Sequence, residues 1–182
     1  MFNERLQIAG EWKVIEKDLD GNIIQESPGH NLITNTGKQM LLTLLFCMNG
    51  SGVSSAIVAC AGACSTVATL ADTTLNYELI ANGNRIPITN LAGAALSTAD
   101  IQSGSFVVNT VTYTRKVTCQ AIWGSSDLNL NQPFREYAIA TALACPTTPT
   151  GTSGVIFNHY IDTQNIVKTG SNSITIQFSV YF

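Results

Sequence analysis

One stretch of this chain combines a helix start signal with helical spacing of its apolar residues. The stretch covers residues 31–46 and opens with three side chains whose oxygens can cap a helix: Thr34, Asn35 and Thr36. Its apolar side chains then form one stripe: Met40, Leu41, Leu44 and Leu45. Almost all other segments have the spacing of strands and turns. The sequence therefore predicts a mainly β protein with one short α-helix at about residues 36–46.

The end of the chain carries the most regular strand pattern. Apolar side chains alternate with polar ones from residue 174 to the last residue, at Ile174, Ile176, Phe178, Val180 and Phe182. Terminal segments fray unless a sheet holds them. We therefore expect a central strand here.

Two further regions predict strands. Residues 6–17, a turn at 18–22 and a returning strand from Ile23 form a predicted hairpin. We expect the segment 27–30, with the sequence Ser-Pro-Gly-His, to break the returning strand. Residues 106–120 predict one long strand, interrupted at Asn109 and Arg115. One side of this strand is rich in threonine. We expect that side to be wet or to contact a neighbour.

Taken together, these elements predict two antiparallel sheets packed as a β-sandwich with jelly-roll-like connections. A chain of 182 residues can bury a substantial core. No internal repeat or block of charge divides it. We therefore expect a single domain over residues 1–182.

The surface is expected to be polar but weakly charged. Charged residues make up 12% of the chain, against about 25% in typical globular proteins. This deficit suits a subunit whose faces meet other subunits. We expect such an interface at Thr110, Thr112, Thr114 and Thr118, and a partner that is a second copy of the chain. Nine scattered Lys and Arg, with a net charge of −3, argue against a nucleic-acid partner.

The five cysteines cannot all pair within one chain. We expect reduced, mostly buried thiols made in a cytoplasm, with a local bridge between Cys60 and Cys64 as the alternative. Residues 1–5 lack the pattern of a signal peptide. The longest apolar run, Met40 to Phe46, is too short to span a bilayer, so we expect no membrane partner.

No motif in the sequence predicts a catalytic, metal or cofactor site. His30 and His159 have no nearby ligand partners, and the Asp-rich turn at 18–22 lacks the Gly and Glu that a calcium loop needs. The cysteines have no local histidine to activate them. The few charges in apolar surroundings are interpreted as ion pairs that fix strand register, or as a catalytic acid with its anchor: Glu78, Arg85, Arg135 and Glu136.

A loose pattern across most of the chain resembles structural proteins of tailed-bacteriophage virions. Its first half is carried by Gly10, Trp12, Asp20, Gly21, residues 31–35 and Gly37. It continues at Asp72, Leu75, Glu78, Arg85, Arg135, Glu136, Asn158, His159 and Lys168. The resemblance implies a non-enzymatic virion subunit, made in the host cytoplasm, that contacts itself and other virion proteins. It implies a tail, neck or fibre-attachment component, with a capsid-decorating (cement) protein as the alternative.

Two hypotheses of other classes stay open. A carbohydrate-binding β-sandwich would present aromatic side chains on an exposed face, and the candidates are Trp12, Trp123 and Tyr181. A hydrolase would need an assembled pair of acids, and the candidates are Asp72, Glu78, Asp127 and Glu136. Glycan binding in solution would favour the first hypothesis. An activity lost in Glu78→Gln would favour the second.

Overall fold

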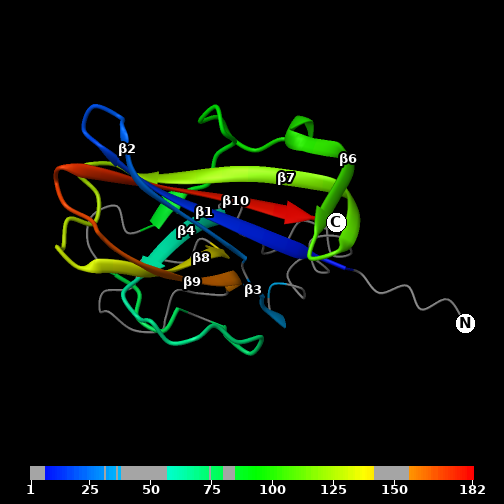
Figure 1. Ribbon diagram of the computed structural model, residues 1–182, viewed down its shortest axis with the longest axis horizontal. Coiled ribbons are helices and arrows are strands. Elements are labelled where there is room, and N and C mark those ends of the chain that lie inside the picture. The colour runs from blue at the N-terminus through cyan, green and yellow to red at the C-terminus, as the bar shows by residue number, and fades with distance from the viewer. Residues whose placement is uncertain are drawn as a thin grey trace, which may run out of the picture.

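A computed structural model describes residues 7–30, 32–35, 37, 57–73, 75–79, 85–141 and 156–182. The described residues form ten strands and one 3-10 turn, η1 (Thr98–Asp100). The strands make two five-stranded sheets that pack face to face (Figure 1). None of the helical segments in these residues is long and apolar enough to cross a membrane.

Every strand pairing is antiparallel. Sheet A runs in the order β2 (Ile23–His30), β1 (Ala9–Asp18), β10 (Asn172–Tyr181), β7 (Val111–Trp123) and β6 (Ile101–Val108). Sheet B runs in the order β3 (Leu32–Ile33), β9 (Ile156–Val167), β8 (Pro133–Thr141), β4 (Ile57–Gly62) and β5 (Arg85–Pro87). The predicted antiparallel β-sandwich is thus confirmed. Jelly-roll connections are not, because several consecutive strands are neighbours within one sheet.

Strand β10 is central, as its alternation predicts. It lies between β1 and β7 in the middle of sheet A. Its apolar side chains Ile174, Ile176, Phe178 and Val180 all enter the core between the sheets. The polar side chains that alternate with them therefore face the other side of sheet A, here called the outer face of sheet A.

The predicted hairpin at the start of the chain is confirmed, but its second strand is longer than expected. Asp18 accepts a hydrogen bond from the Asn22 amide at 2.8 Å, which closes the turn. Strand β2 continues through Pro28 to His30. Proline is tolerated there because β2 is an edge strand, so its missing amide removes no ladder bond on the open side.

The predicted long strand over residues 106–120 is wrong. The chain turns back at Asn109 and Thr110, which have φ angles of 49° and 69°. Two left-handed residues between paired strands make the tight turn of a hairpin, here between β6 and β7. Asparagine adopts this backbone more readily than most residues, which explains why the chain can turn without glycine.

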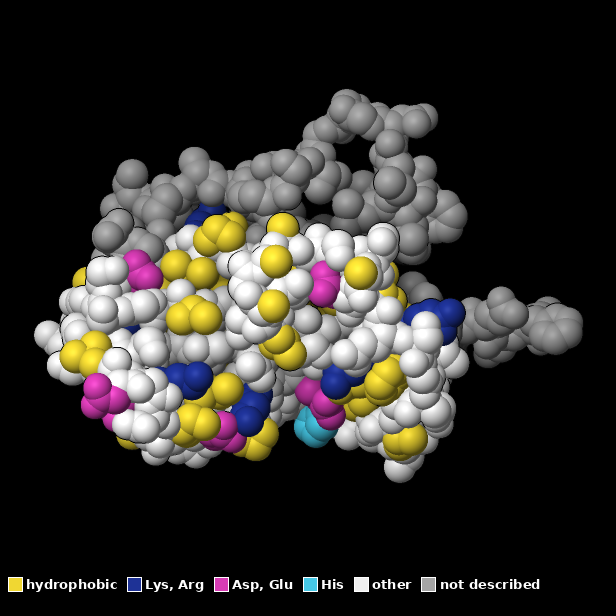
Figure 2. All heavy atoms as spheres, turned by 90° about the horizontal axis from the view of Figure 1, so that it is seen from above, with side chains coloured by type: hydrophobic (Ala, Val, Ile, Leu, Met, Phe, Trp, Pro, Cys, Tyr) yellow, Lys and Arg dark blue, Asp and Glu magenta, His cyan; other side chains and the backbone are white. Residues whose placement is uncertain are grey.

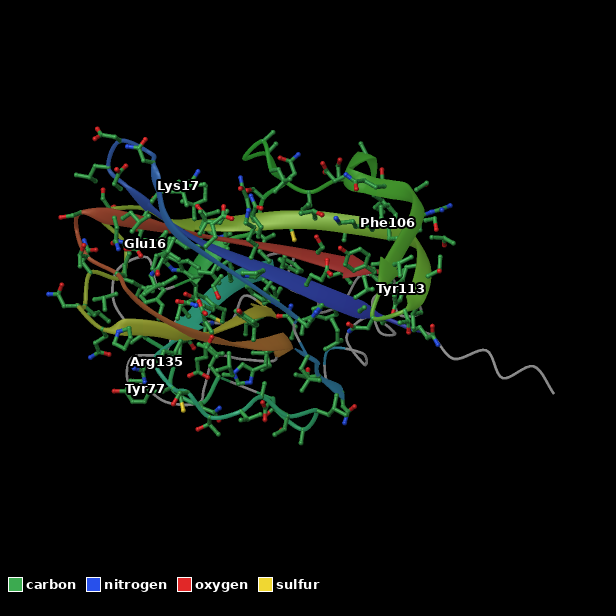
Figure 3. All side chains as sticks on the ribbon, in the orientation of Figure 1. Glu16, Lys17, Tyr77, Phe106, Tyr113 and Arg135 are labelled. Carbon is green, nitrogen blue, oxygen red and sulfur yellow. The ribbon has the colours of Figure 1, made fainter. Side chains whose placement is uncertain are left out.

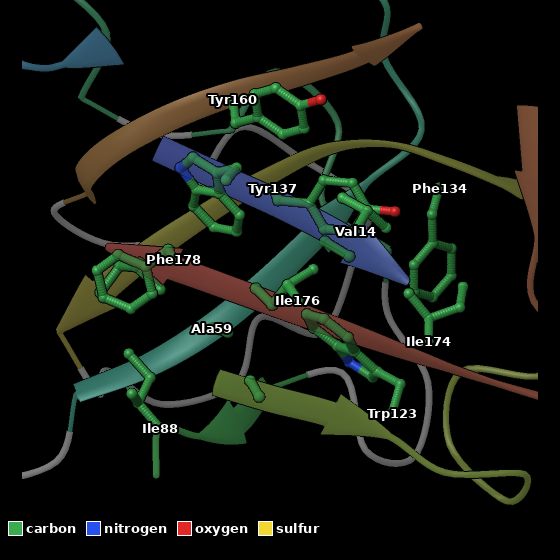
Figure 4. Packing of buried hydrophobic residues seen from close by; sticks show 14 of the residues in the cluster. Val14, Ala59, Ile88, Trp123, Phe134, Tyr137, Tyr160, Ile174, Ile176 and Phe178 are labelled. Atoms are coloured by element: carbon green, nitrogen blue, oxygen red, sulfur yellow. The ribbon is translucent and has the colours of Figure 1, made fainter. Parts of the chain in front are cut away.

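Aromatic side chains from both sheets fill the core (Figure 4). Trp12 of sheet A stacks on Tyr160 of sheet B, with ring centroids 5.6 Å apart and planes 10° apart. Trp123 of sheet A meets the Phe134 ring edge-on at 5.7 Å and the Tyr137 ring at 6.2 Å. These rings bury large apolar areas and tie the two sheets together.

The predicted helix at residues 36–46 lies almost wholly outside the described residues. At its start, Asn35 and Gly37 have helical backbone. The Thr34 hydroxyl accepts from the Gly37 amide at 3.0 Å, as an N-cap does, and it donates to the Ile156 carbonyl at 3.0 Å. Thr34 therefore anchors the start of this segment to β9.

Candidate functional site

The four predicted interface threonines do not form one continuous face. Thr110 lies in the β6–β7 turn and is exposed, whereas Thr112, Thr114 and Thr118 lie on β7. Thr112 and Thr114 are exposed. Thr118 is half-buried, and its hydroxyl lies 2.8 Å from the Ser179 hydroxyl on β10. The structure thus places Thr118 away from the other three, nearer the middle of the sheet.

A bulge in β7 explains this division. The amides of Thr114 and Arg115 both donate to the Phe182 carbonyl, at 3.0 and 3.1 Å, so two residues oppose one. Such a bulge reverses the alternation of side chains along a strand. As a result the Tyr113 ring lies 6.0 Å from the Tyr181 ring, on the side of the sheet that carries Thr118. Thr112 then points to the opposite side.

A hollow of about 530 Å³ lies on the outer face of sheet A. Side chains from β1, β2, β7 and β10 line it, among them Glu11, Lys13, His30, Lys116, Thr118 and Gln177. Figure 2 views this face and shows basic, acidic and histidine side chains around the hollow. The hollow is open and bordered by both signs of charge, which suits contact with another polar surface.

Two residues that line the hollow, Lys116 and Glu11, both contact Tyr181. The Lys116 ammonium lies 5.3 Å from the centre of the Tyr181 ring and 5.9 Å from that of Phe106, within cation–π range. The Tyr181 hydroxyl donates to the Glu11 carboxylate. Burial, together with Glu11, raises the pKa of Tyr181 to about 12, so the hydroxyl stays protonated. Phe106 and Tyr113 lie at the same end of the molecule (Figure 3).

A second cluster lies on the side of sheet B that faces away from the core. Here His159 of β9 joins two carboxylates, and we name these three residues the acid–histidine cluster. The Nδ1 atom of His159 lies 2.6 Å from Asp72 Oδ2, and the Nε2 atom of His159 lies 3.0 Å from Glu136 Oε2. An imidazole donates to two carboxylates only when it is protonated. Burial lowers the pKa of His159, but its hydrogen bonds to the Glu136 and Asp72 carboxylates, with the attraction of their charges, outweigh burial, and the pKa is raised.

The acid–histidine cluster joins Asp72 and the segment 75–79 to sheet B. Glu136 also accepts from the amides of Asn76 and Tyr77, at 3.0 and 2.6 Å. The side chains of His159 and Glu136 are fully buried. Every ring nitrogen and both Glu136 oxygens are engaged within the protein. A substrate therefore has no access to His159 or Glu136. We interpret the cluster as a set of contacts that stabilise the fold.

The other candidate acids do not assemble into a pair. Glu78 forms a buried two-point ion pair with Arg85, at 3.0 and 3.2 Å, as the ion-pair interpretation predicts. Asp127 accepts from the Gly124 amide in the β7–β8 loop. Among the described residues, no group of three His, Cys, Asp or Glu is arranged to hold a metal ion.

The aromatic candidates for glycan stacking are all buried: Trp12, Trp123 and Tyr181. They therefore offer no exposed ring face to a sugar. Cys60, Cys64 and Cys119 are free thiols, so the alternative bridge between Cys60 and Cys64 is absent. Burial raises the pKa of Cys60 and Cys119, which keeps both thiols protonated and unreactive. Cys47 and Cys145 lie outside the described residues.

Sequence reasoning missed two features, the hollow and the meeting of His159 with two acids. The members of the acid–histidine cluster stand 87 and 23 positions apart in the chain, so no local spacing reveals them. The one feature of the sequence that pointed to these residues was the presence of charged side chains in segments that are otherwise apolar or uncharged. Comparisons with protein-family models, curated proteins and solved structures found no match for this chain.

Proposed function

We propose that this chain is a non-enzymatic structural subunit of a tailed-phage virion, as a tail, neck or fibre-attachment component. It assembles with copies of itself and with neighbouring virion proteins through the outer face of sheet A and the adjoining strand β6. The proposal that the chain belongs to a virion rests on the resemblance in sequence. The proposal that it acts through contacts with other subunits rests on its surface.

One observation carries the proposal: β6, β7 and the loop before β6 carry exposed aliphatic side chains, with Ile101 and Val107 on the core-facing side of sheet A and Ile122 on its outer face. They are Leu91, Leu96, Ile101, Val107 and Ile122. Serine and threonine side chains separate them along β6 and β7, and the charged side chains of the outer face lie around the hollow. Apolar groups within a polar, weakly charged rim mark a surface that another protein covers.

The cost of covering this surface is low. Threonine and serine lose less on desolvation than lysine or glutamate. The hollow next to Thr118 gives a partner's side chains a place to enter. A stable contact of this kind buries more than roughly 1,000 Å² in total. The full burial of His159 and Glu136 in the acid–histidine cluster supports a structural role over a catalytic one.

The test places charge on the outer face of sheet A. Thr118 and Ile122 lie on the same side of β7, because their pairing with β10 is regular. We expect Thr118→Lys with Ile122→Lys to leave circular dichroism unchanged and to weaken self-association, measured by sedimentation at rising concentration. Lysines buried in a contact without partners oppose assembly.

The matched control adds two lysines at exposed positions of β9, as Thr163→Lys with Gln164→Lys. This control should assemble like the wild type. A wild type that stays monomeric at high concentration, and that mass spectrometry does not detect in purified virions, would overturn the proposal.

A further inference from the structure

Strand β6 differs from the other edge strands of the sandwich. In the described part of the chain it pairs with β7 on one side and with no strand on the other. Open edges invite pairing with another chain, and proteins usually block them with charge, proline or short length. β6 runs over eight residues, and its first five are exposed.

The remaining three edges carry such protection. β2 contains Glu26 and Pro28, β5 contains Arg85 and Pro87, and β3 has two residues. β6 has the sequence IQSGSFVV, without charge or proline. A bulge between Ser103 and Phe106 is its one irregularity. Bulges also protect edges, so this bulge is the one protective feature of β6, which lacks the charge and the proline found in β2 and β5.

The composition of β6 points to a second copy of the same strand as its partner. In a two-fold antiparallel pair, side chains of one strand meet those of its copy, so any charge meets like charge nearby. β6 is neutral and avoids this repulsion. A register centred on Gly104 sets Ile101 opposite Val107 of the second copy, and Ser103 opposite Ser105.

This register covers exposed apolar surface. Ile101 and Val107 are 49% and 67% exposed, the two largest exposures among the apolar side chains of β6. Ile101 pairs with Val117 and Val107 with Thr112, which places both on the same side of the sheet. Pairing of two copies therefore brings Ile101 of each copy against Val107 of the other, on one face of the joined sheet.

We propose that β6 pairs antiparallel with β6 of a second copy, about a two-fold axis near Gly104. The two copies of sheet A then form one continuous ten-stranded sheet. The inference rests on the proposed function, and it names the partner at one edge of the subunit.

The experiment uses opposite charges on β6. Ser103→Lys with Ser105→Lys should weaken dimer formation roughly tenfold or more, since like charges face each other. Ser103→Glu with Ser105→Glu should do the same. An equimolar mixture of the two variants should restore the dimer. The control, Ser126→Lys with Ser171→Lys, changes two exposed serines away from β6 and should dimerise like the wild type.

Sedimentation and light scattering give the masses, and circular dichroism checks folding. Charged β6 variants that dimerise like the wild type would overturn the pairing, and so would a loss that mixing fails to restore. If the wild type still assembles in either case, the proposed function stands. A wild type that is monomeric throughout overturns both proposals.

Discussion

At the scale of single residues, the most consequential group is His159. It lies fully buried between two carboxylates, where an uncharged imidazole would leave a nitrogen without a proton to donate. The two acids favour the imidazolium more than burial disfavours it. The charge of His159 therefore links Asp72 to Glu136 of β8 across strand β9, in addition to the backbone pairing of β8 with β9.

This arrangement makes stability depend on pH. The pKa of His159 is raised from 6.5, so its contribution is complete below pH 6.5 and is lost as pH rises through the higher folded value. The pKa of Asp72 is lowered from 3.8: burial raises it, but hydrogen bonds from Thr69 and His159 outweigh this. Its contribution is present above pH 3.8 and is lost as pH falls through the lower value. Urea unfolding should show both contributions between these limits.

Removing the imidazole should abolish the alkaline part of this dependence. We expect His159→Gln to cost about 3–5 kcal/mol, since Glu136 stays buried with its charged partner gone. It should also flatten the loss of stability above pH 6.5. The control is His30→Gln at an exposed site. An unchanged pH profile in His159→Gln would contradict the role of the acid–histidine cluster.

At the scale of elements, alternation in the sequence predicted β1 and β10, and residues 111–120 of β7, because each has one face in the core. It failed where a strand ends by turning. The Asn109–Thr110 turn has no glycine or proline, and Val107, Val111 and Tyr113 keep one parity across it. The bulge at Thr114 then reverses the faces. The turn and the bulge both depend on how neighbouring strands pair. The pattern of residues along one strand does not show that pairing.

The turn gives an element-scale prediction. Thr110 is a β-branched residue with φ of 69°, a strained backbone for its type. Thr110→Gly should raise the free energy of unfolding by about 1 kcal/mol, since glycine is the residue that this turn favours. Thr112→Gly, inside β7, should lower it by about 1 kcal/mol. Chemical denaturation measures both. A continuous strand would make both changes destabilising.

At the scale of the whole molecule, the two sheets share one core. Trp12 and Trp123 come from sheet A, and the rings that they contact in sheet B include Tyr160, Phe134 and Tyr137. If the sheets separated, the contacts of Trp12 and Trp123 with these rings would be lost, and each sheet would keep only the aromatic contacts within it. The outer side of each sheet then serves a separate purpose: sheet B anchors Asp72 and the segment 75–79, and sheet A offers the open hollow.

This shared core predicts that the sandwich unfolds as one unit. The slowest amides of β10 in sheet A and of β8 in sheet B should exchange with the same free energy, as hydrogen exchange with mass spectrometry measures. Trp12→Ala should lower both values by about 3–5 kcal/mol, because the lost ring belongs to both sheets. Thr163→Ala, at an exposed site, should change neither. If Trp12→Ala lowered the value for β10 and left that of β8 unchanged, the sheets would be separate cooperative units. The single domain expected for this chain would then be wrong.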